Sequence, residues 1–244
     1  MLIANLGAGA KTSDDPSVVS VDWSIYHRIN RRPLIRSIAT PIFFRGYRRE
    51  RLESLGTNVV VHNLAKGIPF EDQTVDAVYH SHLLEHLDRE VAPGFMAEVH
   101  RVLKPGGLHR IAVPDFEKLC REYLADLEAS AGDDAKAPKH DESIEAIILQ
   151  MVRREAYGTS LQSPVKRKIE NLVLGGARKR GETHQWMYDH VNLRVLLEST
   201  GFADPEVKAY ADSAIPGWAG FGLEVNEDGT EYKPESLYME AIRV

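Results

Sequence analysis

Two neighbouring stretches decide the fold: residues 75–87 read VDAVYHSHLLEHL, and residues 98–113 read EVHRVLKPGGLHRIAV. Each contains a short apolar run with the β-branched content of a buried strand, at residues 75–79 and 108–113. Apolar residues between these runs keep a helical period, and the KPGG sequence at 104–107 is typical of a helix stop followed by a turn. The pattern predicts a strand–helix–strand unit.

The same pattern extends toward both ends of the chain. Further strand-like runs lie at residues 1–6, 18–21, 59–61, 206–210 and 236–242. Up to residue 113 these short runs are separated by longer stretches, which predicts parallel strands joined by crossover helices. From about residue 115 to 188 the sequence is polar, poor in strand formers and mostly helical in pattern, so we expect a helical insertion there. Helices are expected near residues 115–127, 142–155 and 166–180, and Asp115 and Asp189 are expected to cap helices rather than bind metal.

A glycine turn follows the first strand and an acid follows the second. Glycines let a backbone approach a ligand closely, and a carboxylate can accept hydrogen bonds from both hydroxyls of a ribose. Gly7, Gly9 and Asp22 are the residues concerned. This arrangement is typical of a nucleotide site, although Gly-x-Gly also occurs in many ordinary turns.

The central motifs carry a more specific signal. Residues 62–72 (HNLAKGIPFED), with the stretches quoted above, resemble the class I S-adenosylmethionine-dependent methyltransferases in residue type, order and spacing. The resemblance implies an α/β fold: a Rossmann-like, mostly parallel seven-stranded sheet with an antiparallel last strand and helices on both faces. Residues 1–244 would then form a single methyltransferase domain, with residues 115–188 as a helical lid over the substrate.

The resemblance also implies which residues bind S-adenosylmethionine. The glycine turn would pass under the methionine part, an acid would hold the ribose, and other residues would lie beside the adenine or face the sulfonium. The implied cofactor-binding residues are Leu6, Gly7, Ala8, Gly9, Asp22, Trp23, Asn63, Leu64, His80 and Ser81.

Two features depart from the family pattern. Asn63 stands where the family usually has an acid, and an amide is a weaker acceptor for the adenine amino group. Only residues 10–17 separate the glycine turn from the second strand, whereas a crossover helix needs about a dozen residues or more. We therefore expect a loop in place of the first helix, with weaker cofactor binding or another segment filling the gap.

Several histidines are candidates for the chemistry. Methyl transfer to a hydroxyl gains from a general base, and histidine suits proton removal near neutral pH. His82, then His80, then His86 are the candidate catalytic residues, with helix positioning as the alternative for His86. His184 and Tyr188 are expected either to contact the substrate or simply to pack. No ligand spacing singles out a metal site.

An arginine-rich segment at residues 28–51 includes Arg45 and Arg48 and contains a single acid. It predicts either a solvated helix or a basic surface for an anionic partner, such as a phosphorylated substrate or the surface of an anionic membrane. Apolar residues within 35–44 also make a homodimer an alternative to be tested.

The motifs HQWMYD at 184–189 and YKP at 232–234 resemble small bacterial methyltransferases linked to polysaccharide or nucleotide-sugar pathways. The leading acceptor is therefore a sugar, nucleotide-sugar or glycan hydroxyl.

Composition argues against several classes of function and favours a cellular location. The formal net charge of -6 argues against general nucleic-acid binding. The single cysteine excludes an internal disulfide, and no apolar run is long enough for a transmembrane span, so a cytoplasmic location is expected. Two other functions compete with the enzyme: a cofactor-binding scaffold that has lost catalysis, and an NAD-dependent oxidoreductase. The oxidoreductase would explain the glycine turn but not the central motifs.

Overall fold

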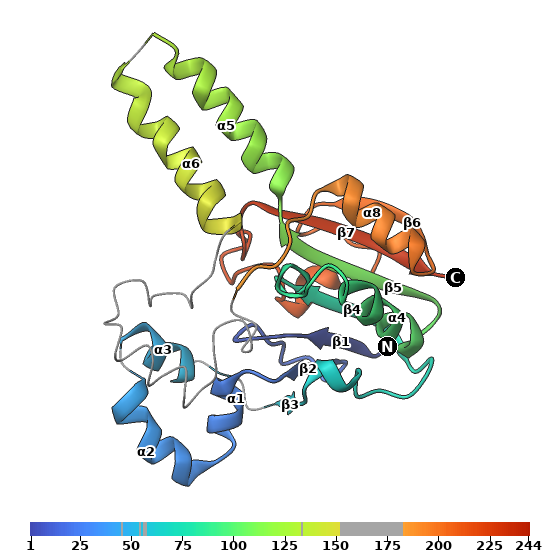
Figure 1. Cartoon of the computed structure of the whole chain (residues 1–244). Helices are drawn as coiled ribbons and strands as arrows, with labels where there is room; N and C mark the ends of the chain where they lie inside the picture. The colour runs from blue at the N-terminus through green and yellow to red at the C-terminus, as the bar shows by residue number, and fades with distance from the viewer. Residues whose placement is uncertain (45, 54, 56–57, 133, 152–182) are drawn as a thin grey trace.

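The computed structural model describes residues 1–44, 46–53, 55, 58–132, 134–151 and 183–244 (Figure 1). A seven-stranded sheet in the order β3-β2-β1-β4-β5-β7-β6 forms its centre. The strands are β1 (Ile3–Leu6), β2 (Val18–Asp22), β3 (Val59–Val61), β4 (Val75–Ser81), β5 (Leu103–Pro114), β6 (Phe202–Lys208) and β7 (Ser236–Arg243). The pairs among β1–β5 are parallel, whereas β7 is antiparallel to both neighbours. The predicted fold class is confirmed.

Helices α4 (Ala92–Val102) and α8 (His190–Ser199) lie side by side against one face of the sheet (Figure 1). Both are amphipathic, because their apolar residues recur at helical spacing and point inward. Met96 and Val99 of α4 and Leu193 and Leu197 of α8 are fully buried in the main core cluster. These helices and the central strands thus form the hydrophobic core of the domain.

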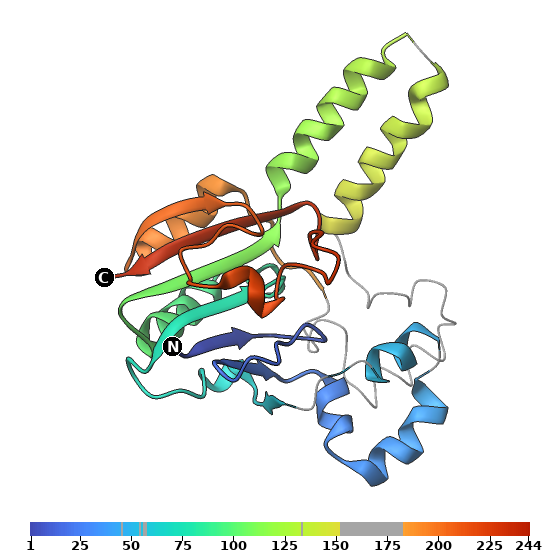
Figure 2. The same ribbon diagram turned by 180° about the vertical axis from the view of Figure 1, so that it is seen from behind.

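No helix connects β1 to β2; residues 7–17 form a loop, as the short connection predicts. The face of the sheet opposite α4 is covered instead by the connection between β6 and β7, which contains the 3-10 helix η5 (Trp218–Phe221) (Figure 2). Ile3 of β1 and Val18 of β2 share a buried cluster with Trp218 and Phe221. A segment about 200 residues away in the sequence therefore fills the place of the missing helix.

A buried ion-pair network holds this covering segment on the sheet. Arg110 of β5 has no solvent exposure, and its guanidinium donates to Glu224 at 2.5 Å and to Glu240 at 2.7 Å. The same group donates to the backbone carbonyls of Ala209 and Asp212. Because the five N–H donors of an arginine form a fixed fork, Arg110 fixes the position of several loops at once.

The insertion after β5 begins with α5 (Phe116–Ser130), η3 (Asp134–Lys136) and α6 (Ala137–Met151). In both views α5 and α6 form a hairpin that projects away from the sheet (Figures 1 and 2). Asp115 accepts a hydrogen bond from the Lys118 backbone and caps α5, and Asp189 forms a capping box with Asn192 at the start of α8. The capping roles predicted for both aspartates are confirmed. The predicted basic helix at 166–180 and the end of the helix predicted at 142–155 lie outside the described residues.

Between β2 and β3 the chain forms α1 (Ile25–Asn30), α2 (Pro33–Phe43) and α3 (Tyr47–Glu53). These helices lie at the end of the sheet where the parallel strands β1 and β2 finish (Figure 1). Tyr26, Phe44 and Leu52 give them a small core of their own. Among the described helices, none combines the length and the hydrophobicity required to cross a membrane.

Candidate active site

A cavity of about 450 Å³ opens at the carboxyl ends of β1 and β4. Its wall is formed by Asn5, Gly7, Ala8, Gly9, Ala10, Lys11, Glu50, Tyr79, Ser81, His82, Leu223, Tyr232 and Lys233. β1 has β2 on one side and β4 on the other, so the cavity lies where the strand order reverses. Ligands of open α/β sheets bind at such a point, and the volume is within the usual range for small-molecule sites.

The pairing register explains which side chains reach this cavity. Asn5 of β1 lies beside Tyr79 of β4, and Leu6 lies beside His80. Successive side chains of a strand point to opposite faces, so Asn5 and Tyr79 face the cavity while Leu6 and His80 face away from it. The side chains of Leu6 and His80 therefore do not line the cavity, and their contributions to the cofactor site remain predictions.

His80 is fully buried on the far face of β4. Its Nε2 atom is 3.0 Å from Nε2 of His109, and its ring packs edge-on against Phe95. Burial lowers the pKa of His80 to about 3, because a charged imidazole loses its hydration there. A neutral, enclosed ring cannot accept a proton from a substrate in the cavity, so the structure does not support the catalytic role predicted for His80.

The glycine turn is held in place by several hydrogen bonds. The amide nitrogen of Asn5 donates to the Lys11 carbonyl at 3.1 Å, and the Gly9 backbone donates to Asp22 at 2.9 Å. His27 donates from Nε2 to the Gly9 carbonyl at 2.7 Å. The loop thus has a fixed shape although no helix follows it.

Within this turn, the backbone at Gly7 lies close to the side chain of Leu83. Its φ of +66° is in the left-handed region, and a Cβ atom built there would lie 3.0 Å from Leu83 Cδ1. Glycine adopts this conformation without strain, and a Cβ at this position would push against the Leu83 side chain. The backbone and Leu83 therefore explain the glycine at this position, and the cofactor role of the turn remains a prediction.

His82, the first candidate for the chemistry, lines the cavity. Its backbone φ of +49° is rare for a residue other than glycine, and such strain clusters at functional sites. The Ser236 hydroxyl donates to the Lys233 carbonyl, so His82 Nε2 donates to Ser236 Oγ at 2.8 Å. His82 Nδ1 lies 3.4 Å from Glu85 Oε1. Partners on both sides therefore fix the ring at the wall of the cavity.

The adenine and ribose side of the predicted site is not part of the cavity wall. Asp22 is buried, and its two oxygens accept the backbone N–H groups of Gly9 and Ser24. Trp23 is 44% exposed, with the Arg28 guanidinium 4.6 Å from the centroid of its ring. Asn63 caps the 3-10 helix η1 (Leu64–Lys66) by accepting the Ala65 N–H, while Leu64 packs at the edge of the core. Their cofactor roles remain predictions.

Sequence reasoning missed the basic and aromatic residues on the other side of the cavity. Lys11 follows the glycine turn directly; its ammonium donates to the Val225 carbonyl at 3.3 Å and lies 4.3 Å from the Tyr232 ring centroid. Burial lowers the pKa of Lys11, while the charge of Glu227 opposes this shift. Lys233 lines the same wall. The YKP motif at 232–234 was visible in the sequence, but nothing local indicated that it meets the glycine turn.

The remaining candidate residues lie beside the cavity rather than in it. Tyr188 is 3% exposed and belongs to the main core; its burial and the nearby Glu85 charge raise its pKa. It packs in the core, and contact with a substrate remains a prediction. His86 and His184 stack edge to face with ring centroids 4.8 Å apart, and neither lines the cavity.

Several side chains of the arginine-rich segment form hydrogen bonds or ion pairs within the protein itself. Arg31 donates to the Val59 carbonyl, Arg36 to the Asn30 amide oxygen and Arg49 to the Glu53 carboxylate. Arg45 and the side chain of Arg48 lie outside the described residues. An anionic substrate for this segment remains a prediction.

We compared the sequence and the structure with those of known proteins. Residues 44–111 match the family described as a methyltransferase domain. Over this stretch the chain is similar to methyltransferase domains. The matched segment runs from the end of α2 through β3, β4 and α4 into β5, and it includes most of the motifs on which the resemblance depends. The predicted enzyme class is thereby confirmed. No curated protein matches the chain.

Solved methyltransferases show a distant likeness to the whole chain. A SAM-dependent methyltransferase from Archaeoglobus fulgidus is 15% identical, with 99% of this chain and 85% of that one aligned and a TM-score of 0.41. The 1,6-didemethyltoxoflavin-N1-methyltransferase of Burkholderia thailandensis, solved with S-adenosylhomocysteine, is 12% identical over 100% of this chain and 71% of that one, with a TM-score of 0.43. The methyltransferase assignment of this chain rests on the domain match and not on these two structures.

Proposed function

We propose that this methyltransferase uses S-adenosylmethionine, bound at the glycine turn, to methylate a small molecule held in the cavity at the ends of β1 and β4. The observation that carries the proposal is the position of this cavity at the reversal of strand order, between the turn and His82. The volume of about 450 Å³ fits a cofactor of this kind. When bound, the cofactor supplies an electrophilic methyl group on a sulfonium.

Charged residues of the cavity wall match the charged groups of the cofactor. Lys11 is placed to pair with the carboxylate of the methionine half, because it is the cation next to the glycine turn in the cavity wall. Glu50 lines the same cavity and is of the right charge for the methionine ammonium. Asp22 keeps lone pairs for a ribose hydroxyl even after accepting two backbone N–H groups.

The acceptor is held on the other side of the cavity, where Tyr79, His82 and Tyr232 provide polar and aromatic surface. Holding a nucleophile close and in line can supply most of the acceleration of a displacement reaction. His82 is the described histidine in the cavity wall; because its Nε2 donates to Ser236, its Nδ1, 3.4 Å from Glu85 Oε1, is the candidate atom to take a proton from a hydroxyl acceptor. A sugar or nucleotide-sugar hydroxyl remains the leading acceptor, supported by the subgroup motifs and by Lys233 as a partner for phosphate.

The test of this proposal is an acceptor screen that measures release of S-adenosylhomocysteine. Nucleotide sugars, neutral sugars and small amines would be compared at equal concentration. We expect turnover with a hydroxyl acceptor and faster turnover with phosphorylated sugars than with neutral ones. Turnover only with amines would contradict the sugar acceptor while leaving the methyltransferase intact.

Two observations favour a second function, a cofactor-binding scaffold without catalysis. The first crossover helix is absent, and both oxygens of Asp22 are engaged by the protein's own backbone. The scaffold would bind S-adenosylhomocysteine but release none from S-adenosylmethionine with any acceptor class in the screen. Binding without turnover therefore selects the scaffold over the enzyme.

A further inference from the structure

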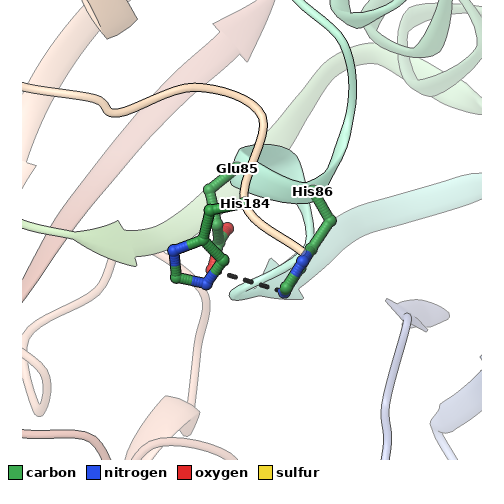
Figure 3. A group of neighbouring side chains, drawn as sticks. All are labelled: Glu85, His86 and His184. Carbon is green, nitrogen blue, oxygen red and sulfur yellow. Dashed lines mark ion pairs between the residues drawn. The ribbon is translucent and has the colours of Figure 1, made fainter. Parts of the chain in front are cut away.

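Three side chains with metal-ligand chemistry meet beside the cavity, outside the site described so far. Glu85 and His86 belong to the 3-10 helix η2 (Leu84–His86), and His184 comes from the end of the insertion (Figure 3). One ligand atom from each lies within 4.8 Å of the other two. Glu85 is fully buried, so its carboxylate is held away from bulk water.

The hydrogen bonds of the two imidazoles fix which nitrogen has the lone pair that a metal ion needs. His86 Nδ1 is 3.1 Å from the Thr183 carbonyl, and His184 Nδ1 is 2.6 Å from the Gln150 carbonyl. A carbonyl oxygen can only accept, so both Nδ1 atoms carry the proton and both Nε2 atoms carry a lone pair in the neutral ring. A histidine that donates one N–H to a carbonyl while its other nitrogen binds metal is the usual arrangement at metal centres.

The backbone around the cluster is also fixed. The N–H groups of Gln185 and Trp186 both donate to the Glu85 carbonyl, at 2.7 and 3.3 Å. The Gln185 side chain donates to the carbonyl and hydroxyl of Thr183. The returning chain is therefore bound along η2, and His184 stays beside His86.

We propose that Glu85, His86 and His184 bind a divalent transition-metal ion of the zinc type. Two imidazoles and one carboxylate are a set that zinc and its neighbours prefer over magnesium or calcium, which favour oxygen ligands. Three protein ligands in a tetrahedral site leave one position for water or another ligand. The ligand atoms lie farther apart than in a filled site, so binding draws the return of the insertion closer to η2.

The site adjoins the proposed active site without being part of it. Glu85 Oε1 is 3.4 Å from Nδ1 of His82, which lines the cavity, and 3.9 Å from Nε2 of His86. A bound ion would tie together the end of β4 and the end of the insertion. Metal binding does not depend on the proposed methyl transfer and can be measured in the absence of any cofactor.

The experiment uses the full chain, treated with EDTA, desalted and titrated with Zn²⁺ by calorimetry and with Co²⁺ by visible absorption. We expect one ion per chain, a Co²⁺ absorption spectrum of a low-coordinate nitrogen–oxygen site, and a rise in melting temperature on adding Zn²⁺. His184→Ala and His86→Ala each remove a ligand and are expected to weaken Zn²⁺ binding at least 10-fold, because loss of even a hydrogen-bond partner of a metal ligand typically costs about 10-fold or more. Mg²⁺ at the same concentration should have no effect.

The matched control is His190→Ala, because His190 also pairs with a glutamate, Glu117, but on the exposed surface. This variant should keep the affinity and the Co²⁺ spectrum. Glu85→Gln removes the charge of the third ligand and should also weaken Zn²⁺ binding. Because Glu85 is buried, a cooperative melting curve is required to show that this variant folds. The proposal is overturned if folded wild-type protein binds no Zn²⁺, or if His184→Ala binds it as tightly as His190→Ala does.

Discussion

At the scale of single residues, the direction of a side chain along β4 decides its role. His80 and Ser81 are adjacent in sequence, yet Ser81 lines the cavity and His80 is enclosed in the core on the opposite face. Sequence motifs located the end of this strand correctly. They could not determine the face, because every residue of β4 is buried or half-buried and so the polar–apolar alternation that marks a face is absent.

Lys11→Met should weaken the binding of S-adenosylhomocysteine by about 10-fold, since a charge-assisted hydrogen bond to the carboxylate contributes about 1.5–3 kcal/mol. Methionine keeps a similar stem and removes only the ammonium. Calorimetry would measure this, with adenosine as the comparison ligand because it lacks the methionine half. Equal losses for both ligands would show instead that Lys11 supports the loop.

His82→Asn should lower kcat by about 10²-fold or more if His82 takes the acceptor's proton. Asparagine tolerates the left-handed backbone of this position, so the substitution removes the imidazole with little added strain. The affinity for S-adenosylhomocysteine should remain within a factor of two to three. His190→Asn, on the exposed surface, is the control; a kcat for His82→Asn equal to that of the control would exclude the proposed role.

At the scale of elements, the short connection at residues 10–17 correctly predicted that no helix follows β1. The segment that takes its place could not be predicted, because it lies near the other end of the chain and pairs with Ile3 and Val18 only in three dimensions. The KPGG motif marks the helix stop as predicted, because α4 ends at Val102, but residues 104–107 form an irregularity within β5 and not a separate turn before it, since the register with β4 shifts there. Local turn residues indicate a break in pairing, but they do not distinguish a turn from a bulge.

The described helices of the insertion, α5 and α6, contribute no residue to the cavity wall. The lid expected from residues 115–188 thus depends on residues 152–182, which lie outside the described residues, and it remains a prediction. The sequence pattern predicted these helices because the spacing of apolar residues is a property of the local sequence. It could not predict that the hairpin projects away from the sheet, since direction depends on tertiary contacts.

Arg110→Met should destabilise the domain by about 3–5 kcal/mol, because it leaves the buried carboxylates of Glu224 and Glu240 without their guanidinium. The covering segment with η5 should loosen first. Urea unfolding monitored by tryptophan fluorescence would report both effects. The matched control is Arg194→Met, which breaks a half-exposed pair with Glu198 and should cost less than about 1 kcal/mol. Similar losses in the two variants would contradict the role given to Arg110.

At the scale of the whole molecule, the sheet keeps two neutral histidines at its centre. His80 and His109 are fully buried, and burial lowers the pKa of both well below that of a histidine in the unfolded chain. Between pH 6.5 and about 3 the unfolded chain therefore binds protons that the folded protein does not. The stability contributed by this difference is complete above pH 6.5 and is lost as the pH falls.

We expect the free energy of unfolding to fall with decreasing pH below 6.5 by up to about 1.4 kcal/mol per pH unit for each of these histidines. Urea titrations at pH 7, 6 and 5 would measure the slope. The double variant His80→Leu/His109→Leu replaces both rings with apolar side chains of similar size, so its slope should be shallower. An unchanged slope in a folded double variant would show that other groups govern the acid response.

The measurement that tests the central claim most directly is calorimetric titration of the full chain with S-adenosylhomocysteine, with NAD as the comparison ligand and Gly7→Val as the comparison variant. We predict one binding site for S-adenosylhomocysteine, no binding of NAD, and at least a 10-fold loss in Gly7→Val, because a side chain at Gly7 meets Leu83 and is strained at a φ of +66°. A cooperative melting curve would verify that the variant folds. Failure of the folded wild-type protein to bind S-adenosylhomocysteine, or equal binding by the variant, would contradict a cofactor site at the glycine turn.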